Sequence, residues 1–459
     1  MDKTYNLVPA DVKTIQTAYR KIQTKIPVPE SIGFFETLLK SEPRSMQGQP
    51  PVLIDSAEGF LVRDKWGNQW IDWSSGVLIM NAGHGRPEIR SALMELIERP
   101  LLSSYVFAHE KRCELTRELE SVSPDPENYK VFLLSTGSEA IENSIKLAKT
   151  YAQNTYGAKR KWIISFNNAF HGRTLGSQLA GGSESQKKWI GDCSAYPFAQ
   201  VPFPDGYKNT DQSFDLFLRS LDKLEIKPDE IAAVLTESYQ GVGPDFLPYE
   251  YAQDLQRFVW QNGILLIFDE VQAGFGRTGS FWGYEQYDIV PDLIVCGKGI
   301  SSSLPLSAVI GRADIMDMYP PGSMTSTHSG SPLPVTAALE SIKIIKKEKL
   351  SERAKRLEPV LMNGLEEVRK RYPERLGCLH GRGLVAGIQV VQKGSKVPDP
   401  DTAFRINEKC FQNGLLMFAP VGIAGECIKI TPPLIISDDA LIESIQVFSD
   451  VCDEVLGAG

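Results

Sequence analysis

Two stretches in the second half of the chain decide its fold: residues 263–279 read GILLIFDEVQAGFGRTG, and residues 292–311 read DLIVCGKGISSSLPLSAVIG. Each contains a short apolar run rich in β-branched and aromatic residues, which is typical of a buried strand. The first run ends at Asp269, and the second leads into Lys298, which stands in a turn between two glycines. The chain therefore places a carboxylate and a lysine each at the C-terminal tip of a buried strand.

A lysine and a carboxylate in such positions are the groups that hold pyridoxal 5′-phosphate. The lysine can form a Schiff base with the cofactor, and the carboxylate can keep the pyridine nitrogen protonated, so that the ring withdraws electrons. A lysine that is desolvated in such a pocket can lose its proton near neutral pH and act as a base. Lys298 and Asp269 are therefore the candidate catalytic residues.

Short apolar strands alternate with helices from residue 129 onward. Strands are predicted at 130–135, 162–166, 231–237, 263–269, 293–297 and 306–311, and helices at 138–152 and 251–261. This alternation predicts an α/β fold with a mostly parallel sheet that helices cover on both faces.

The two ends of the chain have a different pattern. We expect a helix over Asp11–Ile22, then an irregular arm, and two strands within 52–72 joined by a turn at Lys65–Asn68. Further helices are predicted at 87–97, 108–122, 332–350, 351–371 and 438–455, with strands at 384–391, 415–418 and 427–431. The expected organisation is an N-terminal helix and arm (1–50), the N-terminal part of a small domain (51–107), a large domain (108–335) and a C-terminal small domain (336–459).

Composition argues against several classes of protein. The 459-residue chain has a formal net charge of −8, which favours solubility and argues against a nucleic-acid or anionic-membrane partner. Its seven cysteines are scattered without a C-x-x-C pair, and its five histidines form no H-x-x-x-H pair, so we expect neither disulfides nor a metal site. No apolar signal region begins the sequence, and no run approaches 18 apolar residues. We therefore expect a cytoplasmic protein with no membrane span.

Three further motifs suit a flat, phosphorylated cofactor. Gly137 and Ser138 in STGSEA (135–140) stand where a strand meets a helix, and a helix N-terminus suits a phosphate dianion, although an ordinary helix cap explains them equally well. Phe170 and His171 follow a strand in FNNAFHGRT (166–174), so the ring could stack on a cofactor or else belong to the core. Thr327 in STHSGSP (326–332) could donate to a phosphate or simply mark the entry to a helix.

The segment GFGRTG (274–279) matches the G-x-G-x-x-G fingerprint of dinucleotide-binding proteins. The residues that follow, SFWGYEQYD, do not open an apolar-periodic helix, and no acidic residue ends a next strand about 20 residues further on. This context argues against a nicotinamide-dependent dehydrogenase, so we interpret the segment as a glycine-rich loop that shapes the site.

Taken together and in this order, the motifs resemble the class III (omega-type) aminotransferases of the fold-type I pyridoxal-phosphate superfamily, over about residues 50–457. The family signature is an apolar strand ending in D-E-V-x-x-G-x-G-R-x-G, then a strand leading into G-K-x-x-x-x-x-x-P. This chain has it as Asp269-Glu270-Val271, Gly274-Phe275-Gly276-Arg277 and Gly297-Lys298 through Pro305. The resemblance implies a large domain with a mostly parallel sheet and a smaller α+β domain built from both termini.

The resemblance also implies roles for single residues. Lys298 matches the Schiff-base lysine that moves a proton between Cα and C4′, and Asp269 matches the partner of the pyridinium nitrogen. The remaining matches are Gln272 near the phenolic oxygen, Phe170 stacked on the ring, Gly137 and Ser138 in the phosphate cup, and Thr327 of a neighbouring subunit completing that cup. Glu237 matches the first glutamate of E-P-x-x-G-E-G-G, which supports the residues that touch the cofactor. His171, next to Phe170, is a further candidate cofactor residue.

Departures from the family pattern concern the substrate. Val242 stands at the second glutamate of that segment, and Lys429 stands at the arginine that pairs with this glutamate in members using 2-oxoglutarate. These two departures weaken a 4-aminobutyrate or ornithine assignment and leave pyruvate-type acceptors and α-amino acids open. Val77 stands where dialkylglycine decarboxylases carry glutamine, which argues against that branch. The candidate substrate contacts are Val242, Lys429, Val77 and Tyr105.

The expected activity is the ping-pong transfer of an amino group from an amine or amino acid to a 2-oxo acid. The resemblance implies a homodimer with active sites at the interface, and a tetramer is the alternative. Amino-acid racemases and epimerases use the same lysine and aspartate, so this second activity stays open. A non-catalytic binding protein is the third hypothesis, and the presence of both Lys298 and Asp269 argues against it.

Overall fold

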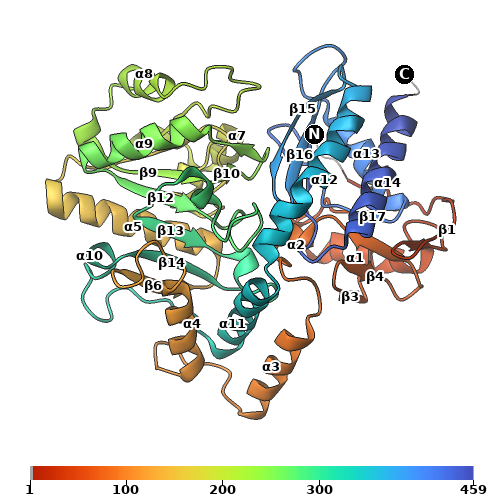
Figure 1. The fold of residues 1–459 in the computed structure, drawn as a ribbon, viewed down its shortest axis with the longest axis horizontal. Helices are drawn as coiled ribbons and strands as arrows, with labels where there is room; N and C mark the ends of the chain where they lie inside the picture. The colour runs from red at the N-terminus through yellow and green to blue at the C-terminus, as the bar shows by residue number, and fades with distance from the viewer. Residues whose placement is uncertain (1–3, 458–459) are drawn as a thin grey trace. The chain divides into compact units, whose positions relative to one another are not determined.

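The computed structural model describes residues 4–457, and the chain folds into two compact units (Figure 1). Pro87–Ser351 form one of them, which we call the central unit. Met1–Arg86 and Glu352–Gly459 together form the other, which we call the terminal unit. The domain limits expected from the sequence, at residues 50, 107 and 335, stay a prediction.

The central unit is built on a seven-stranded sheet. Its strands are β6 (Tyr129–Leu134), β7 (Trp162–Phe166), β8 (Phe198–Val201), β9 (Ile231–Glu237), β12 (Leu265–Asp269), β13 (Leu293–Cys296) and β14 (Ser307–Arg312), in the spatial order β6-β14-β13-β12-β9-β7-β8. All pairs from β13 to β8 are parallel, whereas β14 runs antiparallel to both of its neighbours. The connection from β13 to β14 (297–306) is shorter than the dozen or so residues of a parallel crossover. The predicted mostly parallel sheet is confirmed, with this one exception.

Helices cover both faces of the sheet. The helices of the central unit are α3 (Pro87–Glu98), α4 (Glu110–Glu120), α5 (Gly137–Tyr156), α6 (Leu175–Ala180), α7 (Glu184–Lys187), α8 (Asp215–Lys223), α9 (Tyr249–Asn262), α10 (Ala313–Met316) and α11 (Pro332–Lys347). On one face, the apolar side of α5 packs with Leu265 and Ile267 in a fully buried cluster. On the other face, Phe166 meets Phe217 of α8 and Tyr251 of α9 (Figure 1).

The register of the parallel strands brings their carboxyl ends to one edge. Asp269, the last residue of β12, lies opposite Glu237 of β9 on one side and Val295 of β13 on the other. The segments that follow the neighbouring strands β7 and β13 also leave the sheet at this edge and carry Phe170 and Lys298. In an open α/β sheet, this edge is the usual place for a ligand.

The terminal unit contains two smaller sheets. One is formed by β1 (Ile15–Gln16), β2 (Lys21–Ile22), β3 (Ser56–Glu58), β4 (Leu61–Arg63), β5 (Gln69–Asp72) and β17 (Leu415–Leu416), and the other by β15 (Leu376–Arg382), β16 (Val385–Val390) and β18 (Cys427–Ile430). The unit's helices are α1 (Ile32–Ser41), α2 (Ser75–Leu78), α12 (Leu350–Arg371, beginning in the central unit), α13 (Pro400–Gln412) and α14 (Asp438–Leu456). The segment predicted as a turn at Lys65–Asn68 does join β4 to β5.

The prediction of a helix over Asp11–Ile22 is wrong. This segment forms the β1–β2 hairpin, in which Thr17 Oγ1 accepts hydrogen bonds from the backbone N–H groups of Tyr19 and Arg20. Such local side-chain bonds offer the backbone an alternative to a helix. Ile22 is also fully buried in a cluster with Trp70, so a tertiary contact holds the strand. The helix of this region is α1, which lies where we expected an irregular arm.

Candidate active site

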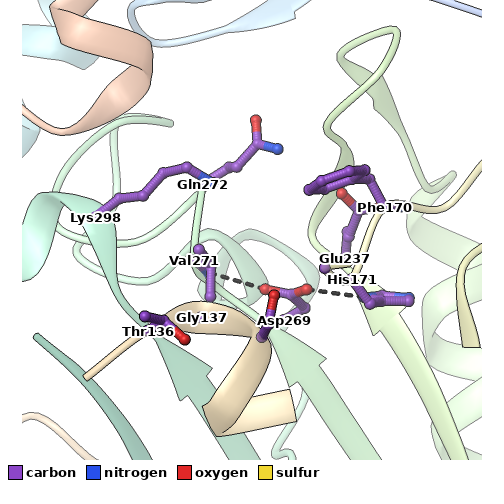
Figure 2. A pocket seen from close by; sticks show the side chains of 11 residues that line it. Thr136, Gly137, Phe170, His171, Glu237, Asp269, Val271, Gln272 and Lys298 are labelled. Atoms are coloured by element: carbon purple, nitrogen blue, oxygen red, sulfur yellow. Dashed lines mark hydrogen bonds and ion pairs between the residues drawn. The ribbon is translucent and has the colours of Figure 1, made fainter. Parts of the chain in front are cut away.

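A cavity at the carboxyl edge of the central sheet gathers the predicted cofactor residues except Thr327 (Figure 2). It is lined by Thr136, Gly137, Ser138, Phe170, His171, Gly172, Glu237, Asp269, Val271, Gln272 and Lys298, all of which belong to the central unit. Figure 2 shows Asp269 and His171 side by side at the bottom of the view, with Phe170 and Lys298 above them on opposite sides. Thr136, Gly172 and Val271 are lining residues that the sequence did not single out.

The Asp269 carboxylate is held by two neighbours. Its Oδ1 accepts a hydrogen bond from the backbone N–H of Val271 at 3.0 Å, and its Oδ2 lies 2.8 Å from Nδ1 of His171 (Figure 2). An ionised carboxylate only accepts hydrogen bonds, so Nδ1 of the imidazole carries the hydrogen. The His171 side chain is fully buried, and within residues 4–457 its Nε2 has no hydrogen-bond partner. Asp269 is therefore a buried, oriented acceptor.

Lys298 begins a short 3-10 turn, Lys298–Ile300, directly after β13. Its φ of +43° lies in the left-handed region, which a residue with a Cβ adopts only at a cost. Burial lowers the pKa of the Lys298 ammonium, while the carboxylates of Asp269 and Glu237 act in the opposite direction. The amine is thus closer to losing its proton at neutral pH than a surface lysine.

Glu237 ties two loops to the end of β9. Its Oε2 accepts from the backbone N–H of Phe170 at 3.1 Å, and its Oε1 accepts from that of Gly241 at 2.7 Å. Burial raises the pKa of Glu237 to about 7, although these two bonds and nearby His171 favour the ionised form. The side chain therefore fixes the backbone that carries the Phe170 ring.

The N-terminus of α5 forms another wall of the cavity. Thr136 is the residue before the helix, and its hydroxyl accepts from the backbone N–H of Glu139 at 3.3 Å. A Cβ on Gly137 would lie 3.1 Å from a methyl group of Val271, so close approach to β12 favours glycine here. The φ of Gly137 is not in the left-handed region, so this close approach, and not the backbone conformation, favours glycine here.

This set of groups fits pyridoxal 5′-phosphate. The first amides of α5 and the Ser138 hydroxyl suit a phosphate dianion. Phe170 offers an aromatic face, and the buried carboxylate of Asp269 suits a protonated ring nitrogen. Lys298 supplies a primary amine in the same cavity. A dianion, a flat ring and an aldehyde therefore each find a matching protein group.

Three of the predicted residues of the central unit do not line this cavity. Thr327 is exposed in the segment before α11, and Val242 is partly buried between the short strands β10 (Tyr239–Gln240) and β11 (Asp245–Phe246). The hydroxyl of Tyr105 lies 3.0 Å from that of Thr325. None of these three residues is among those that line the cavity.

Two candidate substrate residues belong to the terminal unit. Val77 has a left-handed φ of +64° and is about half exposed. Lys429 lies on β18 opposite Gly387, and only 3% of its surface is accessible. A lysine is seldom buried to this extent unless it is paired. Lys429 is therefore a residue of the interior and not of the solvated surface.

Residues 4–457 offer neither a metal centre nor a membrane-spanning helix. No group of three or more His, Cys, Asp or Glu side chains in this range is arranged to hold a metal ion. No helix of the same range combines the length and the apolar composition needed to cross a membrane. The seven cysteines are all free thiols.

The family follows from comparison with known proteins. The family model for class III aminotransferases matches residues 44–452 of the chain. The chain belongs to this family. The predicted resemblance is thus confirmed, and with it the fold-type I architecture and the dependence of the family on pyridoxal phosphate. The protein is a class III aminotransferase, which exchanges an amino group between an amine and a 2-oxo acid.

Similar proteins include enzymes with several activities. The chain is 31% identical to a 4-aminobutyrate aminotransferase of Mycobacterium leprae, over 94% of this chain and 98% of the relative. It is 30% identical to an alanine/serine racemase of Pyrococcus horikoshii, over 98% of this chain and 96% of the relative. A structure of the ornithine aminotransferase of Toxoplasma gondii, with partial occupancy of pyridoxal phosphate at its active site, matches with a TM-score of 0.81 at 26% identity, over 94% of this chain and 96% of that one.

Proposed function

We propose that Lys298 and Asp269 are the catalytic residues of this class III aminotransferase. The observation that carries the proposal is their convergence in one cavity, at the ends of adjacent parallel strands, with the N-terminus of α5 beside them. When bound, pyridoxal phosphate supplies an aldehyde and an electron-withdrawing ring. The lowered pKa of Lys298 favours the neutral amine, so its Nζ would take a proton from the substrate Cα and deliver it to the carbon of the cofactor aldehyde, C4′.

Asp269 and His171 act as one unit in this proposal. Asp269 keeps a proton on the ring nitrogen, and its bonds to His171 and to the Val271 N–H hold the carboxylate in one orientation. Because both side chains are buried, the charge of Asp269 acts at low dielectric and is little screened by water.

The remaining lining residues are assigned to binding. The amides of Gly137 and Ser138, with the hydroxyl of Ser138, bind the phosphate, and Thr327 of the partner subunit completes this cup. Phe170 covers the ring, with Glu237 holding its backbone, and Gln272 lies at the phenolic oxygen. The Gln272 amide lies beside Gly241, where a Cβ would come within 2.1 Å of its nitrogen.

The substrate assignment rests on two departures from the family pattern. Val242 has no charge to offer, and Lys429 presents a point charge in place of a bidentate guanidinium. We propose that the chain lacks the glutamate–arginine exchange of members that use 2-oxoglutarate, and that Val77 and Tyr105 also face the substrate. Comparing pyruvate with 2-oxoglutarate as acceptor tests this directly, and a strong preference for 2-oxoglutarate would contradict it.

A homodimer in the cytoplasm is also proposed. Large apolar side chains are exposed along residues 94–107 of the central unit: Met94, Ile97, Leu101, Leu102, Tyr105, Val106 and Phe107. Clusters of this kind on a protein surface usually mark an interface. The seven free thiols support a reducing compartment.

The half-reaction with an amino donor alone tests the activity. The loaded enzyme should lose the visible absorbance of its pyridoxal form and release an equivalent of oxo acid per site. A racemase would keep this absorbance and scramble the configuration at Cα. The similarity to an alanine/serine racemase is the reason to measure this second outcome. The second result would overturn the aminotransferase proposal for this chain.

A further inference from the structure

Two side chains on α5, one helical turn apart, contact the same loop. Ser138 and Glu142 are four residues apart and so lie on the same face of the helix. Both bond to the segment Arg173–Ser177, which follows Gly172 of the cavity wall and leads into α6. The loop therefore joins a residue that lines the cavity to one that does not.

The contact at Ser138 determines which way its hydroxyl can donate. Its Oγ accepts a hydrogen bond from the backbone N–H of Arg173 at 3.2 Å. A serine hydroxyl has one hydrogen and two acceptor sites, so accepting this bond leaves the hydrogen available for another acceptor. In the proposed phosphate cup, that acceptor is a phosphate oxygen.

Glu142 holds the loop that supplies this N–H group. Its Oε1 accepts from the Thr174 hydroxyl at 2.6 Å and from the backbone N–H of Ser177 at 3.0 Å. The second donor is one of the first amides of α6, which have no partner within the helix itself. One carboxylate oxygen thus fixes both ends of the turn Thr174–Ser177.

Two glycines leave room for these contacts. A Cβ on Gly172, whose φ is +131°, would lie 2.3 Å from Oγ of Ser138. A Cβ on Gly176 would lie 2.3 Å from Oε2 of Glu142. A methyl group at position 176 would therefore displace the Glu142 carboxylate, because the end of a flexible side chain yields before the backbone does.

We propose that Glu142 is a positioning residue for phosphate binding: it fixes the 173–177 loop, and the loop orients the Ser138 hydroxyl toward the phosphate. This inference rests on the proposed function, in which Ser138 belongs to the phosphate cup. Glu142 itself touches neither phosphate nor substrate.

The test compares two ligands of the apoenzyme, pyridoxal 5′-phosphate and pyridoxal, by their dissociation constants. Glu142→Ala should weaken binding of the phosphorylated ligand about tenfold, the effect of losing hydrogen bonds to a charged group. Binding of pyridoxal should change little, because it lacks the phosphate. Glu142→Gln keeps an acceptor oxygen and should lie closer to the wild type. Glu114→Ala, an exposed glutamate on α4, is the control and should match the wild type for both ligands.

A second variant keeps the carboxylate but moves it. Gly176→Ala should favour the helix by propensity alone, yet it should weaken binding of the phosphorylated ligand as Glu142→Ala does. Equal weakening of both ligands would show a general structural role and overturn the inference. A second result would also overturn the inference: Ser138→Ala weakens binding of the phosphorylated ligand, but Glu142→Ala and Gly176→Ala leave it unchanged. If Ser138→Ala also has no effect, the phosphate cup of the proposed function is itself wrong.

Discussion

Asp269 illustrates how one side chain acquires its function from its neighbours. The carboxylate is buried, and it accepts one bond from a backbone N–H and a second from His171, so its direction is fixed. A residue with the same shape and no charge would keep much of this geometry. The charge of Asp269 can therefore be tested separately from its position.

Asp269→Asn should reduce kcat by about 10²-fold or more, because a preorganised charge at the reacting group is lost. The variant should remain folded and should still bind pyridoxal phosphate, since the phosphate and ring contacts are unchanged. Steady-state rates with a saturating donor and acceptor, alongside a cofactor titration, measure both quantities. A near-normal kcat would mean that the ring nitrogen meets another residue.

Glu270, next in sequence, is fully buried and has partners of its own. Its Oε1 and Oε2 accept from the backbone N–H groups of Tyr284 and Gly283 at 2.9 and 2.7 Å, and the Ser238 hydroxyl also bonds to Oε1. No charged partner is among these contacts. Burial raises the pKa of Glu270 from 4.5 to about 7, and the three bonds oppose that rise.

Glu270 should make the stability of the protein depend on pH. A raised pKa means that the folded state holds the proton more tightly than the unfolded chain. The stabilising contribution is complete below the unfolded pKa and is lost as the pH rises through about 7. Urea unfolding should show Glu270→Gln losing less stability than the wild type between about pH 5 and pH 8, by on the order of 1–3 kcal/mol. Parallel pH curves for the two proteins would contradict this assignment.

At the scale of single residues, the sequence allowed much of the site to be predicted. Lys298 and Asp269 were predictable because each directly follows an apolar run and belongs to a specific signature. Val271 was missed as a wall of the cavity, although it stands in the D-E-V of that signature. A valine carries no chemical signal, and only its contact with Gly137 identifies its place.

At the scale of elements, the start of α5 approaches the segment that follows β12 closely. Gly137 begins α5, and Val271 follows β12 by two residues. A Cβ on Gly137 would lie 3.1 and 3.3 Å from the two Val271 methyl groups. Helix and strand therefore approach closely because one of the facing residues is glycine.

Gly137→Ala should weaken binding of pyridoxal phosphate, because α5 must move away from β12 to admit the methyl group. Val271→Ala removes the methyl groups in question, so Gly137→Ala/Val271→Ala should bind more tightly than the first variant alone. The effects of the two changes on the free energy of cofactor binding should depart from additivity by about 0.5–3 kcal/mol, as expected for residues in contact. Additive effects would mean that this contact does not set the position of α5.

The prediction of elements succeeded where the pattern was strong and failed where tertiary contacts decide. The strands over 162–166 and 231–237 have the predicted bounds, because a buried run of apolar residues bounded by polar ones is unambiguous. The antiparallel direction of β14 and the hairpin at residues 15–22 depend on connection length and on burial against Trp70. Neither property follows from local periodicity.

At the scale of the whole molecule, the two units have surfaces that the single chain does not cover. Phe107 is 76% exposed in the segment that links α3 to α4, and Leu102 is 60% exposed in the same segment. In the terminal unit, none of the residues of α1 is buried, although the helix carries Phe34 and Leu38. Burying such side chains against a second copy would be favourable by about 25 cal/mol per Å².

Leu102→Glu/Phe107→Glu should shift the protein from dimer to monomer in light scattering at micromolar concentration, since two charges would enter an apolar interface. Loss of the dimer should also weaken cofactor binding, because the partner's Thr327 is proposed to reach the phosphate. Trp260→Glu, on the 71%-exposed Trp260 of α9, is the control and should remain dimeric. A double variant with unchanged mass would place the interface elsewhere.

The most direct measurement of the central claim is the identity of the lysine that carries the cofactor. The loaded enzyme is reduced with borohydride, digested and analysed by mass spectrometry. The cofactor should be attached to the peptide containing Lys298, and Lys298→Ala should lose both the attachment and the visible absorbance while the protein stays folded. Attachment to any other lysine, or turnover by Lys298→Ala without added amines, would contradict the site described above.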